Sequence, residues 1–351
     1  MTLPCGIRNY KYAQDMAIVR TRTQWGLLIG LLIVLFAAPL YLPNFWLGVF
    51  NLIGITLIAA IGLNILVGYC GQLSIGHAGF IAVGAYTSAI LTNRFEMPFL
   101  VGFIGAGLVS GLIGLIFGLP SVRVKGFYLA ITTIAAQFII IWVINHMGIT
   151  GGFTGIKVPP ASIGDLVFRS ETSQFFLIIT IAVLCVLFAK NLARTKVGRA
   201  FIAIRDNDLA AEVMGVNLLY YKLLAFFIGC FFAGIAGGLL AHYWGFLNAE
   251  MFSFTDSILY IGMIIIGGLG TSLGPILGVV LIRLLQQVLL PIYLVPFLEN
   301  SFKSFPSGFA TGVTPMLFGL IIVLFLILEP RGLAHRWALF KSAYRLWPFS
   351  Y

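Results

Sequence analysis

The sequence predicts an all-α polytopic integral membrane protein with about ten transmembrane helices, in a range of eight to eleven. Three observations support this fold class. Of the 351 residues, 60% are hydrophobic and only 9% are charged, whereas soluble globular domains carry about 25% charged residues. Long apolar runs follow one another along the chain, and the basic residues are concentrated between alternate runs. An ordinary water-soluble enzyme is therefore excluded.

The number of crossings follows from the apolar runs, because a helix needs roughly 20 apolar residues to span a bilayer. Clear candidates are 25–43, 46–67, 98–119, 127–146, 174–189, 223–244 and 313–328. The stretch 257–295 is long enough for two crossings and is interrupted between Gly267 and Pro275. The stretch 74–92 is apolar but contains glycine, serine and histidine, so it either crosses fully or is re-entrant. Counting it as a crossing gives ten.

The basic residues predict the orientation of the chain. The 21 Lys and Arg and the 11 Asp and Glu give a net charge of +10. With ten crossings and a cytoplasmic N-terminus, sixteen basic residues fall inside and four outside, while Arg283 lies in a span. Cytoplasmic loops are enriched in Lys and Arg, so the excess charge indicates topology, and no nucleic-acid partner is expected. The expected parts are a cytoplasmic N-terminal segment 1–24, a transmembrane domain 25–329 containing the cytoplasmic loop 190–222, and a basic cytoplasmic tail 330–351.

The loop 190–222 is the longest internal polar stretch, and its pattern predicts two short helices. The first contains residues 199–205. The second runs over residues 209–214, with Asp208 as its expected N-terminal cap and Gly215 as its stop.

Apolar residues share faces on the second of these helices. Leu209 and Val213 are four residues apart, as are Ala210 and Met214. Ala210 and Ala211 are expected to leave a smooth patch that another protein can approach closely. The alternative is an amphipathic helix that rests on the lipid headgroups.

Polar residues interrupt the apolar stretch that follows residue 67. Gln72, Ser74 and His77 are costly inside a membrane unless they are paired or face a cavity. The five glycines between Gly68 and Gly84 permit an unwound backbone, which membranes tolerate only inside protein or beside water. The three polar side chains are therefore candidates for lining a translocation path. The alternative is helix packing with internal hydrogen bonds.

The interruption after residue 266 supplies the other candidates for the path. It contains Gly267, Gly268 and Gly270 and ends at Pro275. Interrupted hydrophobic segments often mark a transport site.

Taken together, these segments resemble the permeases of branched-chain amino acid ABC transporters, the LivM type. The cytoplasmic signature of that family is similar to GRAFIAIRDNDLAA at 198–211 followed by Gly215. Other blocks of the family are similar to GYCGQLSIGHAGF at 68–80, TGG at 150–152 and GGLGTSLGP at 267–275. ABC importers in general show Glu-Ala-Ala, three residues and Gly; this chain keeps Ala210, Ala211 and Gly215 but has Leu209 at the Glu position.

The resemblance implies a permease subunit that moves branched-chain or related hydrophobic amino acids across the plasma membrane, in bacteria the inner membrane. It implies a second permease, two ABC ATPase subunits that bind the ATP, an external solute-binding protein and surrounding lipid as partners. The loop that couples to the ATPases would use Arg199, Arg205, Asp206, Asp208, Ala210, Ala211, Glu212 and Gly215.

The absence of several motifs argues against other classes of function. The chain has no Gly-x-x-x-x-Gly-Lys-Ser/Thr motif, so we do not expect it to hydrolyse ATP itself. It shows no catalytic constellation and no metal-ligand spacing, so no catalytic residue, metal or cofactor is expected. No acidic residue lies deep in a clear span, which weakens a stand-alone secondary transporter as the alternative. An ABC permease for urea or short-chain amides is the other alternative, because the motifs of such permeases are close to those of the branched-chain amino acid permeases.

Overall fold

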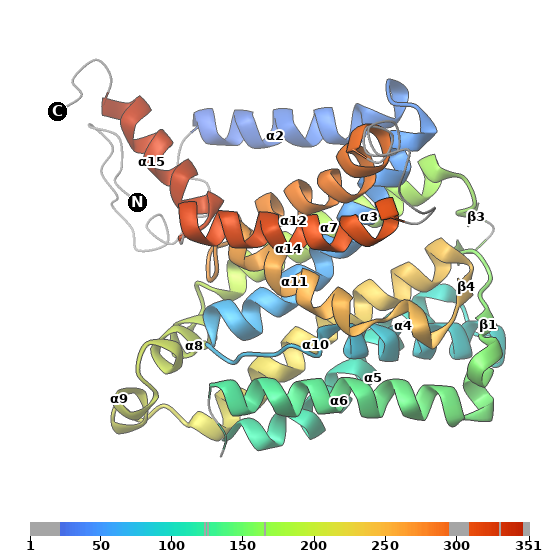
Figure 1. Ribbon diagram of the computed structural model, residues 1–351, viewed down its shortest axis with the longest axis horizontal. Coiled ribbons are helices and arrows are strands. Elements are labelled where there is room, and N and C mark those ends of the chain that lie inside the picture. Colours follow the sequence, from blue (N-terminus) through green and yellow to red (C-terminus); the bar gives the residue numbers. More distant parts are fainter. Residues whose placement is uncertain are drawn as a thin grey trace.

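The computed structural model describes residues 22–122, 124, 126–164, 166–294, 309–329 and 331–346. Residues 1–21 of the predicted N-terminal segment therefore lie outside the described residues. The same holds for residues 295–308, residue 330 and the end of the tail. The described chain is a bundle of helices that run roughly side by side (Figure 1). This confirms the predicted helical fold class.

Ten described helices occupy the apolar stretches recognised in the sequence. They are α2 (Arg22–Ala37), α3 (Asn44–Leu63), α4 (His77–Asn93), α5 (Phe99–Gly118), α6 (Phe127–His146), α7 (Glu171–Leu192), α10 (Leu218–Trp244), α11 (Phe254–Gly267), α12 (Gly274–Leu284) and α14 (Phe309–Leu328). Among the described residues, six helical stretches are long and apolar enough to cross a membrane: Asn44–Tyr69, Phe99–Gly118, Phe127–His146, Glu171–Leu192, Leu218–Trp244 and Ala249–Gly267. The count of about ten crossings stays a prediction.

The remaining elements are short and lie at the ends of the bundle. Helices α8 (Lys196–Asp206), α9 (Asp208–Val213) and α15 (Leu333–Leu346) lie at one end, which we call the loop end (Figure 1). Strand β1 (Ile156–Lys157) pairs with β4 (Phe246–Leu247), and β2 (Ser162–Ile163) pairs with β3 (Leu166–Val167), both antiparallel. These strands mark the opposite end, which we call the strand end (Figure 1).

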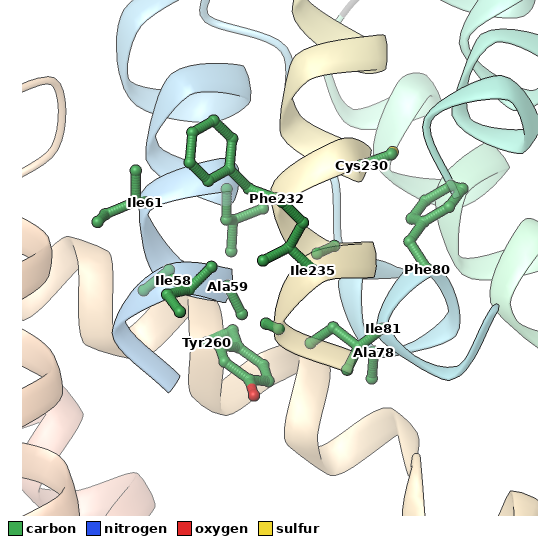
Figure 2. Packing of buried hydrophobic residues seen from close by; sticks show 14 of the residues in the cluster. Ile58, Ala59, Ile61, Ala78, Phe80, Ile81, Cys230, Phe232, Ile235 and Tyr260 are labelled. Carbon is green, nitrogen blue, oxygen red and sulfur yellow. The ribbon is translucent and has the colours of Figure 1, made fainter. Parts of the chain in front are cut away.

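Helices α3, α4, α5 and α10 pack closely to form the core. Figure 2 shows Ile58 of α3, Ile81 of α4 and Ile235 of α10 converging in it. Small residues allow this approach, since a Cβ atom on Gly84 of α4 would overlap the backbone of Gly234 of α10. The outer helices expose apolar side chains along their length, as expected of helices that face lipid.

Helix α4 begins inside the bundle. A π-helical turn (Asn64–Tyr69) extends α3 to the loop end, and the chain then runs without helical structure to Gly76. The first residue of α4, His77, contacts the carbonyl of Ala59, ten residues before Tyr69. At 1.5 Å per residue, this start lies about 15 Å into the bundle. The glycine pattern correctly predicts the unwound segment.

The far end of α4 lies at the strand end. The Asn93 side chain donates a hydrogen bond to the carbonyl of Lys157 in β1, at 3.0 Å. Arg94, just after the helix, donates to the carbonyl of Gly148, also at 3.0 Å. The segment from residue 70 to residue 93 therefore runs from one end of the bundle to the other and does not return to the end where it starts.

Candidate coupling and translocation site

The loop between α7 and α10 forms the two helices expected from its sequence, α8 and α9. The cap of α9 is Asn207, whose extended backbone (φ −159°) lets its side-chain oxygen accept a hydrogen bond from the Ala210 amide at 3.1 Å. The expectation that Asp208 is the cap is wrong, because Asp208 is already helical and its carboxylate lies 3.7 Å from the Lys222 ammonium. Gly215, at φ +86°, is the stop as predicted.

Helix α9 presents apolar side chains to its surroundings. Leu209, Val213 and Met214 are 66%, 87% and 83% exposed, and Ala210 beside them is also exposed. Ala211 is only 4% exposed because it faces the bundle. The expected patch of two alanines is therefore wrong for Ala211, and the exposed apolar surface consists of the other four side chains.

The other residues named for the loop have separate positions. Arg199 in α8 is exposed and donates a hydrogen bond to the carbonyl of Arg194 within the same loop, at 3.1 Å. Glu212 in α9 is also exposed.

Arg205 connects the end of α8 to the membrane-embedded part of the chain. One guanidinium nitrogen donates a hydrogen bond to the carbonyl of Gly68 in the π-helical turn, at 3.0 Å. Another lies 2.9 Å from the carboxylate of Asp206. A Cβ atom on Gly270 would lie 2.7 Å from this guanidinium and 2.7 Å from the carbonyl of Gly68. The loop and both glycine interruptions therefore meet at Arg205.

Asn64 joins the two interruptions directly. Its side-chain amide donates a hydrogen bond to the carbonyl of Thr271 and accepts one from the amide of Gly270, each at 3.0 Å. Asn64 is 3% exposed. The sequence interpretation missed this residue, although an asparagine inside the apolar run 46–67 is the signal that would have found it.

The second interruption is formed by the glycines that the sequence singles out. Gly267 ends α11, and Gly268 and Gly270 have φ values of +116° and +69°. Residues other than glycine rarely adopt such backbone angles. The side chain of Thr271 closes the turn, since its hydroxyl bonds the carbonyl of Gly268 and the amide of Gly274.

The polar residues of the first interruption are buried. Gln72 is 4% exposed, and Ser74 and His77 are fully buried. The Gln72 amide donates to the sulfur of Cys70, and one His77 ring nitrogen contacts the carbonyl of Ala59. Among the described residues, the carbonyl oxygen of the Gln72 side chain, the Ser74 hydroxyl and the other His77 nitrogen have no hydrogen-bond partner.

Side chains from α6 and α11 hold the start of α4. The Thr133 hydroxyl accepts a hydrogen bond from the amide of Ile75, and the Ser257 hydroxyl accepts one from the amide of Ala78, both at 2.9 Å. Ser257 donates in turn to the side chain of Gln137 at 2.7 Å. These residues are also absent from the sequence interpretation, because only the fold brings three distant helices to one point.

A cavity of about 360 Å³ lies at the loop end beside the first interruption. Residues 70–72, the start of α6, the α8–α9 segment and Lys222 of α10 form its walls. No group of three or more His, Cys, Asp or Glu side chains in the described part of the chain is arranged to hold a metal ion.

Comparison with known proteins places this chain in a family. The family described as branched-chain amino acid transport system / permease component matches residues 45–328. The high-affinity branched-chain amino acid transport system permease protein LivM of Salmonella typhimurium is 31% identical over 331 residues, which cover 87% of this chain and 74% of that protein. LivM of Escherichia coli is 30% identical over the same shares.

More distant similarity extends to a second type of permease. The high-affinity branched-chain amino acid transport system permease protein LivH of Salmonella typhimurium is 26% identical, over 62% of this chain and 76% of that protein. No solved structure matches the chain significantly. With its apolar helices, the chain is a multi-pass membrane protein. The match over most of its length confirms the resemblance found in the sequence: the chain belongs to the family of permease components of branched-chain amino acid transport systems.

Proposed function

We propose that this chain is the transmembrane permease subunit of an ABC importer for branched-chain or related hydrophobic amino acids. The exposed apolar surface of α9, formed by Leu209, Ala210, Val213 and Met214, is the observation that carries the coupling role. Exposed apolar side chains at the end of a polar loop are typical of a surface that another protein covers. ATP hydrolysis on partner subunits then supplies the energy, and this chain itself binds no cofactor.

The partners in this proposal are a second permease, two ABC ATPase subunits and an external solute-binding protein. The similarity to both LivM and LivH supports a second permease. The position of Arg205 supports the proposed coupling to the ATPases, since its side chain links α8 to the carbonyl of Gly68. A movement imposed on α8 and α9 would reach both glycine interruptions through this link.

The proposed translocation path passes the two interruptions. Gln72, Ser74 and His77 line it on one side, and Gly267, Gly268 and Gly270 on the other. Buried polar atoms without protein partners support this assignment, because such atoms are normally bonded to protein, water or ligand.

The proposed topology has ten crossings in the plasma membrane, which in a bacterium is the inner membrane. Both termini and the loop end are cytoplasmic. The loop between α7 and α10 supports this orientation, since six Lys and Arg lie between residues 190 and 222.

Reconstitution tests the function directly. The chain is incorporated into proteoliposomes with its second permease, its ATPases and its solute-binding protein, and uptake of labelled L-leucine is measured with and without ATP. We expect uptake that requires ATP and every subunit. Uptake of urea and not of leucine would show that the chain is a permease for urea or short-chain amides. Uptake by this chain alone, driven by an ion gradient, would show a secondary transporter and overturn the proposal.

A further inference from the structure

Helix α15 begins at the loop end, where two apolar helices of the bundle end (Figure 1). Helix α7, which is long and apolar enough to cross a membrane, ends at Leu192. Helix α14 ends at Leu328, and this side chain is 71% exposed, as expected of a residue that still faces lipid. Because the apolar part of a spanning helix ends where the lipid headgroups begin, α15 starts at the level of the headgroups.

The first turn of α15 is held against the second interruption. A Cβ atom on Gly332 would lie 2.6 Å from the backbone of Gly268, and Ala334 is only 8% exposed. From residue 336 to residue 344, by contrast, every residue of α15 is exposed. The helix leaves the bundle obliquely at the loop end (Figure 1). Its position is therefore fixed at one end, while the rest of it lies free of the bundle.

The exposed part of α15 has an aromatic face. Trp337, Phe340 and Tyr344 are three and four residues apart and share one side of the helix. They are 53%, 63% and 76% exposed, and the rings of Trp337 and Phe340 stack with their centroids 5.9 Å apart. Ser342 lies on the opposite side. Tryptophan and tyrosine are enriched at membrane–water interfaces, and a helix with one such face and basic residues beside it lies in the plane of the interface.

Three cations gather between α15 and the end of α7. The like charges of Arg194 and of Lys341 in α15 both act on Lys190, which lies in the last turn of α7. In the described part of the chain, none of the three forms an ion pair with a carboxylate, whereas Arg336 of α15 is paired with Glu329. Since like charges that share a site repel one another, an anion between them would stabilise this arrangement.

Apolar surface leads from these cations toward the middle of the bundle. Leu184, Leu187 and Phe188 share one face of α7 just before Lys190, and they are 59%, 39% and 53% exposed. A free phosphate would gain nothing from these side chains or from the aromatic face of α15. A phospholipid with an anionic headgroup matches both parts, because its phosphate meets the cations and its acyl chains meet the apolar surface.

We propose that α15 lies on the membrane surface at the loop end, with its aromatic face turned into the lipid, and that Lys190, Arg194 and Lys341 bind the headgroup of an anionic phospholipid. Lys190 also lines a small recess with Ser272 and Pro275 of the second interruption. The bound headgroup therefore lies next to that interruption. The inference does not depend on which solute the chain transports.

Lipid retention tests the headgroup site. The purified permease complex is mixed in detergent with equal amounts of dioleoylphosphatidylglycerol and dioleoylphosphatidylcholine, and the lipid molecules that stay bound are counted by native mass spectrometry. We expect the wild type to retain at least three times as much phosphatidylglycerol as phosphatidylcholine. Lys190→Gln combined with Lys341→Gln is expected to bring this ratio close to one.

A matched double variant is the control for lost charge. Lys157→Gln combined with Arg169→Gln removes two exposed cations at the strand end and should keep the wild-type ratio. If the first double variant does not assemble, Lys341→Gln alone decides, because that residue is exposed, and it should lower the ratio at least twofold. No preference in the wild type, or an unchanged ratio in the variants of Lys190 and Lys341, overturns the headgroup site.

Fluorescence quenching tests the position of α15. Single cysteines at Phe340 and Ser342 are placed in a chain whose four native cysteines are replaced, and each is labelled with a nitrobenzoxadiazole fluorophore. In nanodiscs of the same two lipids, we expect iodide to quench Phe340→Cys at least threefold less than Ser342→Cys, with or without the ATPase subunits. Equal quenching at the two positions overturns the surface position. Protection of Phe340→Cys only when the ATPases are bound would overturn it too, since a protein would then cover the aromatic face.

Discussion

Arg205 is the residue at which the polar loop meets the membrane-embedded chain. Arg205 stabilises the fold only modestly, because its partly exposed ion pair with Asp206 contributes at most about 1 kcal/mol. Its position is more informative than its energy, since the same guanidinium reaches the carbonyl of Gly68 and lies against Gly270. The sequence could single out Arg205 through its motif, but its partner Gly68 lies 137 residues away along the chain, so no local pattern reveals this contact.

Reversing the charge of Arg205 tests the coupling role. In Arg205→Glu the hydrogen bond to Gly68 is lost, and a second carboxylate stands beside Asp206. We expect the chain to insert normally and the complex to hydrolyse ATP, while leucine uptake per ATP falls at least tenfold. Lys196→Glu makes the same charge change at the other end of α8 and should retain coupling. Normal coupling in both variants would remove the role assigned to Arg205.

The pH dependence of Cys70 labelling reports on its environment. Burial raises the pKa of the Cys70 thiol to about 11. Only the thiolate reacts with maleimide, and below the pKa its fraction rises about tenfold per pH unit. We therefore expect slow N-ethylmaleimide labelling at pH 7.5 that accelerates up to pH 9.5, followed on the Cys70 peptide by mass spectrometry. The denatured chain, with an ordinary thiol pKa, should react faster at pH 7.5; equal rates would contradict a buried Cys70.

At the scale of the elements, apolar runs and glycines predict most of the structure. The run 127–146 coincides with α6, and the unwound segment and the interruption after α11 fall where glycines gather. The π-helical end of α3 could not be predicted, because it depends on tertiary contacts: the carbonyl of Gly68 bonds to α8, and Asn64 bonds to the second interruption. π-Helical turns are rare and are frequently found at functional sites, which fits this position.

Removing the Asn64 side chain tests the hydrogen bonds that connect the two interruptions. Asn64→Ala leaves the amide of Gly270 and the carbonyl of Thr271 without their partner, so we expect a loss of stability of about 2 kcal/mol. We also expect leucine uptake to fall more than ATP hydrolysis, because the two interruptions then move independently.

Asn51→Ala is the matched control for that variant. Asn51 is a fully buried asparagine on the same helix, and its amide donates to the Glu171 carboxylate at 2.8 Å, at the strand end. Its removal should cost similar stability, measured by thermal denaturation of the purified complex, and should leave the ratio of uptake to hydrolysis unchanged. Equal ratios in the two variants would reduce Asn64 to a purely structural residue.

For the whole molecule, composition predicts a membrane protein, and charge placement predicts its orientation. The helix count is harder to derive, since α4 has 17 residues and an unwound entry, and α12 has 11 residues followed by a π-helical stretch. Length and apolarity therefore recognise six spans among the described residues, although helices occupy all ten stretches. For α4 and α12 the difference arises because interrupted segments are stabilised by contacts with protein, such as the bond from the Ile75 amide to Thr133.

Side-specific labelling decides the topology. Single cysteines at Glu96, Lys157 and Lys196 are placed in an otherwise cysteine-free chain that still transports, and each is treated with a membrane-impermeant maleimide. Glu96 follows α4, Lys157 lies in β1 at the strand end, and Lys196 begins α8 at the loop end. We expect Glu96→Cys and Lys157→Cys to react in intact cells and Lys196→Cys only in inside-out vesicles. Because Asn93 is bonded to Lys157, labelling of residues 96 and 157 from opposite sides would contradict the fold itself, whereas a reversal of all three would leave the fold intact and invert the orientation inferred from the basic residues.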